Sequence, residues 1–90
     1  MSTLSDDEIR KRLASLPGWE HAGREIRKVY TFPDFKASMA FVNRVAALAD
    51  KMDHHPDILI NYSRVTLTLS SHDAGGLTER DFRLAGQIDA

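Results

Sequence analysis

The most informative absence in the chain is that of cysteine, which excludes disulfide bonds and zinc sites built on thiolates. No apolar run is long enough to span a bilayer. The chain has a net charge of −1, so it lacks the excess of basic residues that is typical of nucleic-acid-binding domains. The segment from Met1 to Glu8 is polar and acidic, unlike a secretory signal. We therefore expect a soluble cytoplasmic protein that uses neither a nucleic-acid partner nor a membrane.

A length of 90 residues favours a single domain, spanning residues 1–90, and no internal repeat or linker divides it. Hydrophobic residues make up 42% of the chain, which is ordinary for a globular protein with a packed core. That core must be small, because chains of this size bury only about 60–65% of the surface of their unfolded state. Self-association would add to the stability of such a domain.

Apolar periodicity and turn residues predict three helices and two hairpins. Ser5 and Glu8 form a capping-box pattern before the first helix, and Pro17-Gly18 ends that helix. Pro56 disfavours helical backbone at the residue before it, so the long helix must end shortly upstream. The predicted elements are a helix at 5–16, strands at 19–22 and 25–32, a helix from 33–34 to 52–54, strands at 58–61 and 65–69, and a last helix that follows Thr78.

This order, α-β-β-α-β-β-α, predicts an α+β fold. Hairpin connections make the four-stranded sheet antiparallel, and three helices cover one of its faces in a two-layer sandwich. In the last strand Val65, Leu67 and Leu69 should face the core, while Thr66 and Thr68 face the other way. The uncovered face and the sheet edges are most simply explained by a symmetric oligomer.

Three of the four histidines fall in two short loops. His54 and His55 follow the long helix, and His72 follows the last strand. If the second hairpin folds back, both loops lie at the same end of the sheet, around one shallow pocket. The carboxylates that could lie near them are Asp50, Asp53, Asp57, Asp73 and Asp81.

Such a cluster suits acid/base chemistry, because imidazoles titrate near pH ~6.5 and a pair can hold one proton between them. One ring can then donate a proton while another accepts one. Three readings compete with this one. The histidines could be solvated surface residues, three imidazoles could hold zinc with one position open, and Asp81 could simply close a capping box with Thr78. Neighbouring histidines rarely point at one ion, and no His-x-x-x-His pair is present, so we expect no metal.

Several segments in combination resemble the pterin-4a-carbinolamine dehydratases. The resemblance runs from about Trp19 to the end of the chain, and the later Ser-His and Glu-Arg-Asp elements at matching spacing make it specific. It implies the α+β fold predicted above, homodimers or homotetramers, and no metal or organic cofactor. The segments that carry it are Gly18-Trp19, Phe32-Pro33-Asp34-Phe35, Asp50-Lys51-Met52-Asp53-His54-His55-Pro56-Asp57, Leu67-Thr68-Leu69-Ser70-Ser71-His72 and Gly76-Leu77-Thr78-Glu79-Arg80-Asp81.

The resemblance also implies a site, position by position. His54, His55 and His72 match the catalytic histidines and would also contact the substrate, together with Asp53, Ser70, Ser71 and Asp73. Asp50 and Asp81 match carboxylates that orient the imidazoles. The sequence departs from the family at Ile58, where aromatic residues are frequent, and at Asp50, where glutamate is usual. The shorter side chain of Asp50 suggests that it reaches its histidine through a water.

The activity implied is that of a 4a-hydroxytetrahydrobiopterin dehydratase, a hydro-lyase. It removes water from the 4a-hydroxytetrahydropterin to give quinonoid dihydropterin and so recycles the cofactor of aromatic amino acid hydroxylases. We hypothesise that His54 and His72 share the acid/base work while His55 binds and polarises the substrate. Two alternatives stay open: a protein-binding transcriptional co-factor, and a role on another pterin, as in molybdopterin metabolism.

Overall fold

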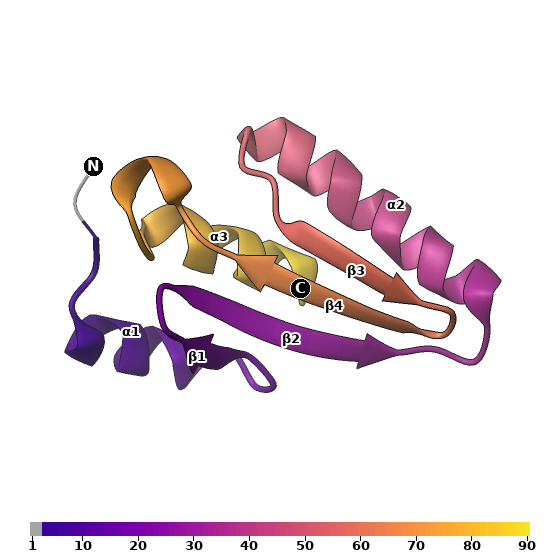
Figure 1. Cartoon of the computed structure of the whole chain (residues 1–90), viewed down its shortest axis with the longest axis horizontal. Coiled ribbons are helices and arrows are strands. Elements are labelled where there is room, and N and C mark those ends of the chain that lie inside the picture. Colours follow the sequence, from indigo (N-terminus) through magenta and orange to yellow (C-terminus); the bar gives the residue numbers. More distant parts are fainter. Residues whose placement is uncertain (1–2) are drawn as a thin grey trace.

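Alternating apolar residues and two tight turns shape the chain into the predicted two layers (Figure 1). The computed structural model describes residues 3–90, so Met1 and Ser2 of the predicted domain lie outside the described residues. The elements are α1 (Asp6–Leu13), β1 (Glu20–Ala22), β2 (Glu25–Thr31), α2 (Phe35–Met52), β3 (Asp57–Asn61), β4 (Arg64–Leu69), the short 3-10 helix η1 (His72–Ala74) and α3 (Glu79–Ile88).

The four strands form one antiparallel sheet in the order β1-β2-β4-β3. The second hairpin does fold back, because Asp57 at the start of β3 pairs with Thr68 near the end of β4. The chain therefore enters β3 and leaves β4 at the same end of the sheet. This register brings the loop before β3 close to the loop after β4, as the sequence predicted.

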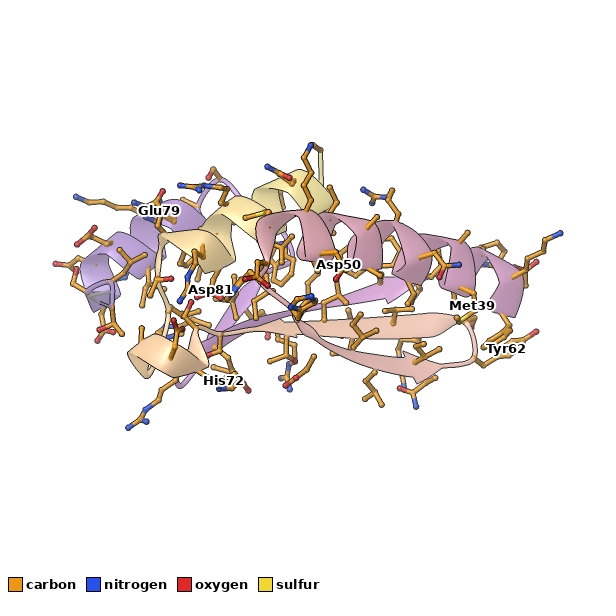
Figure 2. The ribbon with its side chains drawn as sticks, turned by 90° about the horizontal axis from the view of Figure 1, so that it is seen from above. Met39, Asp50, Tyr62, His72, Glu79 and Asp81 are labelled. Carbon is orange, nitrogen blue, oxygen red and sulfur yellow. The ribbon has the colours of Figure 1, made fainter. Side chains whose placement is uncertain are left out.

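The helices lie in one layer and the sheet in the other, which Figure 2 shows from above. Val65, Leu67 and Leu69 are fully buried against the helices, and the threonines between them face away, as expected for a strand with one buried face. The opposite face carries Val29 and Leu59, which are 49% and 56% exposed. None of the helices within residues 3–90 is both long enough and apolar enough to cross a membrane.

Two differences from the sequence prediction go beyond a shift of one or two residues at the end of an element. The first helix ends at Leu13 rather than Leu16, because Ser15 and Leu16 donate their N–H groups to carbonyls three residues earlier and tighten the chain into a turn. The loop after β4 is not wholly irregular, since it contains η1, closed on both sides by a bridge between Ser71 and Gly76. Glycine-rich composition alone did not reveal that short helical turn.

The last turn of α3 is tied to the sheet through one carboxylate. Asp89 accepts hydrogen bonds from Trp19 Nε1 at 2.8 Å, Lys28 Nζ at 2.9 Å and Tyr30 Oη at 2.5 Å. Burial acts to raise the pKa of Asp89, but the three donors outweigh it and hold the pKa below its ordinary value. Burial of the phenol, together with the contact to Asp89, raises the pKa of Tyr30.

Asp89 should therefore contribute stability that depends on pH. A carboxyl whose folded-state pKa is depressed stabilises the fold above its unfolded pKa of ~3.9 and loses that contribution as pH falls through the folded value. We expect Asp89→Asn to lower the free energy of unfolding by about 1.5–3 kcal/mol at pH 7, the range for hydrogen bonds to charged groups. Urea unfolding of both chains at pH 7 and pH 3 measures this. A difference of equal size at both pH values would contradict it, and Asp7→Asn, at an exposed ion pair, is the control.

Candidate active site

His54 reaches the interior because α2 ends in a left-handed turn. Asp53 has φ 50° and ψ 43°, a conformation that aspartate tolerates better than most residues. The backbone N–H of His54 then returns to the carbonyl of Ala49 at 3.0 Å, which closes the end of the helix. The imidazole points inward and is only 7% exposed. A histidine so placed needs a polar partner, because burying an unpaired ring nitrogen is unfavourable.

That partner is Asp81, in the first turn of α3. Its Oδ1 lies 2.6 Å from Nε2 of His54, and the carboxylate is fully buried. Its Oδ2 accepts two further hydrogen bonds, from the hydroxyl of Ser71 at 2.8 Å and from the backbone N–H of Thr78 at 2.9 Å. The Thr78 contact is the capping-box role suggested for Asp81, so the same side chain closes the helix and holds the histidine.

These contacts determine where the proton of His54 lies. Oδ2 of Asp81 already accepts two donors and carries no proton itself. With Asp81 as a carboxylate, the proton in the short contact between Oδ1 and Nε2 comes from the imidazole, so Nε2 of His54 is the donor. In its neutral form His54 therefore keeps a lone pair on Nδ1. A buried carboxylate at Nε2 also stabilises the ring when Nδ1 takes up a proton, as in other Asp–His pairs.

His55 has a different partner and a different environment. Its Nε2 lies 2.8 Å from Oδ1 of Asp50, in the last turn of α2, and both side chains are exposed. The expectation that Asp50 reaches its histidine only through a water is wrong, since the two atoms are in direct contact. The left-handed turn at Asp53 brings the chain back toward Asp50 and makes up for the shorter side chain.

His72 begins η1 and is exposed, beside the bridge between Ser71 and Gly76. Within residues 3–90 its ring has no hydrogen-bond partner. The loop itself is held by Asp73, whose Oδ1 lies 2.6 Å from a guanidinium nitrogen of Arg80 in α3. That hydrogen bond holds the pKa of Asp73 below its ordinary value, so the carboxylate stays charged. His72 is thus an accessible imidazole on an anchored loop.

The two histidine loops are connected through Asp81, which binds both His54 and the residue before His72. Figure 2 shows Asp81 and His72 at one end of the sheet, whereas Met39 and Tyr62 lie at the other. Of the residues expected to bind substrate, Asp53 and Asp73 are exposed. Ser70 is half-buried and donates its hydroxyl to the carbonyl of Arg24 at 2.8 Å.

Ser71 differs from the other residues in that set. Its side chain is 1% exposed, and its hydroxyl is occupied by Asp81 and by Oγ1 of Thr78, each at 2.8 Å. Sequence reasoning gave no site role to the Thr78 hydroxyl or to Arg80. The spacing from Asp73 to Arg80 offered no signal, because the contact forms only when η1 packs against α3.

No group of three or more histidine, aspartate or glutamate side chains lies close enough to hold a metal ion anywhere in residues 3–90. The adjacent His54 and His55 bind separate carboxylates instead. A fold of this kind with two carboxylate-held imidazoles and a third accessible one defines a small α+β domain equipped for proton transfer.

Comparison with known proteins places this domain in a family. The model of the family described as "Pterin 4 alpha carbinolamine dehydratase" matches residues 2–90, and the chain belongs to that family. A protein of Roseiflexus sp. (strain RS-1), provisionally named a pterin-4-alpha-carbinolamine dehydratase, is 56% identical over 86 residues, which cover 96% of this chain and 92% of that protein. A protein of the same provisional name from Acidobacterium capsulatum is 56% identical over 90 residues and covers 100% of this chain and 98% of its own.

A solved structure supports both the family and the fold. The chain is similar to a protein from Brucella melitensis described as a transcriptional coactivator/pterin dehydratase, with a TM-score of 0.94 and 32% identity. The match covers 98% of this chain and 96% of the other. The four-stranded antiparallel sheet with three helices, predicted from the sequence, is confirmed.

Proposed function

We propose that this protein dehydrates a 4a-hydroxytetrahydropterin, the 4a-carbinolamine of tetrahydrobiopterin being the reference substrate. The bond between C4a and its hydroxyl oxygen breaks, and the hydroxyl leaves as water after it receives a proton. N5 loses its proton, and the electron pair of that bond forms the C4a=N5 double bond of quinonoid dihydropterin. The reaction needs one general acid and one general base near one face of the ring.

The observation that carries this proposal is the buried contact between His54 and Asp81. We assign the base to Nδ1 of His54, because the carboxylate at Nε2 stabilises the imidazolium that forms when Nδ1 takes the N5 proton. We assign the acid to His72, because its exposed ring can be reprotonated from solvent between turnovers. The proton from His72 then leaves in the water that is formed, and the N5 proton stays on His54. Exchange with solvent afterwards reprotonates His72 and deprotonates His54.

His55 has a supporting role in this scheme. Its ring is held at Nε2 by Asp50, which leaves Nδ1 to bind and polarise the pterin at the rim of the site. Asp53, Ser70 and Asp73 are the remaining proposed ligands. Asp53 at the end of α2 and Asp73 within η1 are exposed acceptors, to which the amino and ring N–H groups of a pterin could donate.

The remaining expectations are part of the same proposal: a cytoplasmic protein that recycles the pterin of an aromatic amino acid hydroxylase, with no metal and no organic cofactor. We propose a homodimer or homotetramer, which is supported by the open edge of β3 and by the exposed Val29 and Leu59 on the uncovered sheet face.

The direct test is the breakdown of freshly generated 4a-carbinolamine, followed by absorbance with and without the purified protein. We expect the protein to accelerate loss of the carbinolamine catalytically. The rate with a second pterin, which has a different side chain at C6, measures how strongly the protein recognises that side chain. The same preparation should weigh two or four times 10.1 kDa by light scattering and contain no stoichiometric metal. A rate equal to that of buffer at stoichiometric protein would refute the proposed reaction.

A further inference from the structure

The hydroxyl groups of Ser71 and Thr78 lie beneath the candidate site and are not exposed at its surface. Ser71 is 1% exposed and Thr78 is fully buried, and their oxygens lie 2.8 Å apart. We propose that Ser71 and Thr78 are positioning residues, which act through Asp81 to fix the ring nitrogen on which His54 carries its proton. The catalytic part of this inference rests on the proposed function, whereas the tautomer of His54 can be measured without it.

The direction of the hydrogen bonds supports this assignment. Ser71 has one hydroxyl proton and gives it to Oδ2 of Asp81. The contact between the two hydroxyls therefore uses the proton of Thr78, so donation runs from Thr78 to Ser71 and on to Asp81. Each donor polarises the next one, and the negative charge at the end of the chain is stabilised. Oδ2 of Asp81 is thereby committed as an acceptor and the carboxylate form is favoured, so that in the contact with Oδ1 the donor is Nε2 of His54.

Because this hydrogen-bond network is buried away from water, the loss of any one of its side chains should disturb the others. His54, Ser71, Thr78 and Asp81 are all buried, so a water cannot readily take the place of a deleted hydroxyl. Without the Ser71 hydroxyl, Oδ2 keeps only the backbone N–H of Thr78 as a donor. The negative charge of Asp81 is then less well stabilised, so an unprotonated Oδ1 facing His54 is less favoured. The imidazole can then populate both tautomers.

A helix cap alone would explain part of the geometry, because the Thr78 N–H and Asp81 also close the first turn of α3. Capping and positioning differ in what they predict. A cap stabilises α3 and leaves the His54 tautomer as it is. Positioning requires that loss of a hydroxyl changes the tautomer, even in chains that remain folded and bind substrate normally.

The experiment compares Ser71→Ala and Thr78→Val with Thr78→Ser, which restores the hydroxyl. The ¹⁵N shifts of the His54 ring in the ligand-free chain report the tautomer, and steady-state kinetics report kcat and KM separately. Ser38→Ala is a matched control for the loss of a buried hydroxyl, since Ser38 is fully buried and donates its hydroxyl to the carbonyl of Asp34 within α2 and its cap. Ser5→Ala is the control for loss of a helix cap, at the start of α1.

We expect the wild-type chain and Thr78→Ser to show His54 protonated at Nε2 alone, as do both controls. Ser71→Ala and Thr78→Val should show a mixture of tautomers and a fall in kcat of about tenfold, the lower end for loss of one hydrogen bond to a charged group, with KM little changed. An unchanged single tautomer in folded Ser71→Ala and Thr78→Val would overturn the inference. If the wild-type chain shows no dehydratase activity while the two variants still show the tautomer shift, the positioning role is supported and the proposed reaction is refuted.

Discussion

The double variant His54→Ala, His72→Ala is expected to dehydrate the 4a-carbinolamine no faster than buffer. A positioned general acid or base typically contributes about 10²–10⁴-fold, and this variant removes both. Each single variant should keep part of the rate, since the remaining histidine still serves one proton transfer. Stopped-flow measurement of carbinolamine loss, at several protein concentrations, gives the rates. Near-wild-type turnover in the double variant would rule out the assignment of acid and base to this pair.

Folding must be checked separately, because His54→Ala leaves the buried Asp81 with one donor fewer. Circular dichroism at the assay temperature answers that question. His21→Ala is the matched control, since His21 is an exposed histidine bonded to the carbonyl of Gly23 at the β1–β2 turn and has no part in the proposed proton transfers. Its rate should equal that of the wild-type chain.

Asp81→Asn should be the most damaging single substitution that leaves the fold in place. The amide oxygen can occupy the position of Oδ2 and still accept from Ser71 and from the backbone of Thr78. The amide nitrogen then faces His54 and donates to Nε2, which forces the ring proton onto Nδ1. The base is lost with the lone pair, and we expect kcat to fall by about 10²–10⁴-fold.

The control for Asp81→Asn is Asp50→Asn, which alters the other carboxylate–histidine contact. Asp50 and His55 are both exposed, so water can replace part of their interaction, and the loss should be much smaller. We expect Asp81→Asn to lower the free energy of unfolding by about 1–3 kcal/mol, while the chain stays folded at 25 °C. Equal losses of kcat in the two variants would show that burial of Asp81 has no special role.

The sequence was sufficient for the fold because the signals that specify it are local. Alternation of Val65, Leu67 and Leu69 with threonines defines a strand with one buried face, and Pro56 limits where α2 can end. The location of the histidine loops followed from one long-range assumption, the pairing of β3 with β4, which the register confirms.

The detail of the site depended on contacts between distant residues. His54 and Asp81 are 27 positions apart, and nothing in either segment alone tells which carboxylate meets which imidazole. The local pattern predicted that Asp81 caps the last helix with Thr78. The tertiary structure shows that Asp81 also contacts His54. Ser71 was expected at the substrate because it precedes His72, whereas burial of its side chain turns its hydroxyl toward Asp81.

The left-handed backbone of Asp53 has a consequence for how substitutions at that position are interpreted. Glycine adopts this conformation freely and asparagine and aspartate tolerate it, whereas it costs other residues roughly 1–2 kcal/mol, and β-branched residues fit it worst. An inactive Asp53→Val chain would therefore report a misdirected His54 as readily as a lost contact with the pterin. Asp53→Gly separates the two, because it removes the carboxylate and keeps the turn. Position 53 thus acts on the site through the path of its backbone as well as through its side chain.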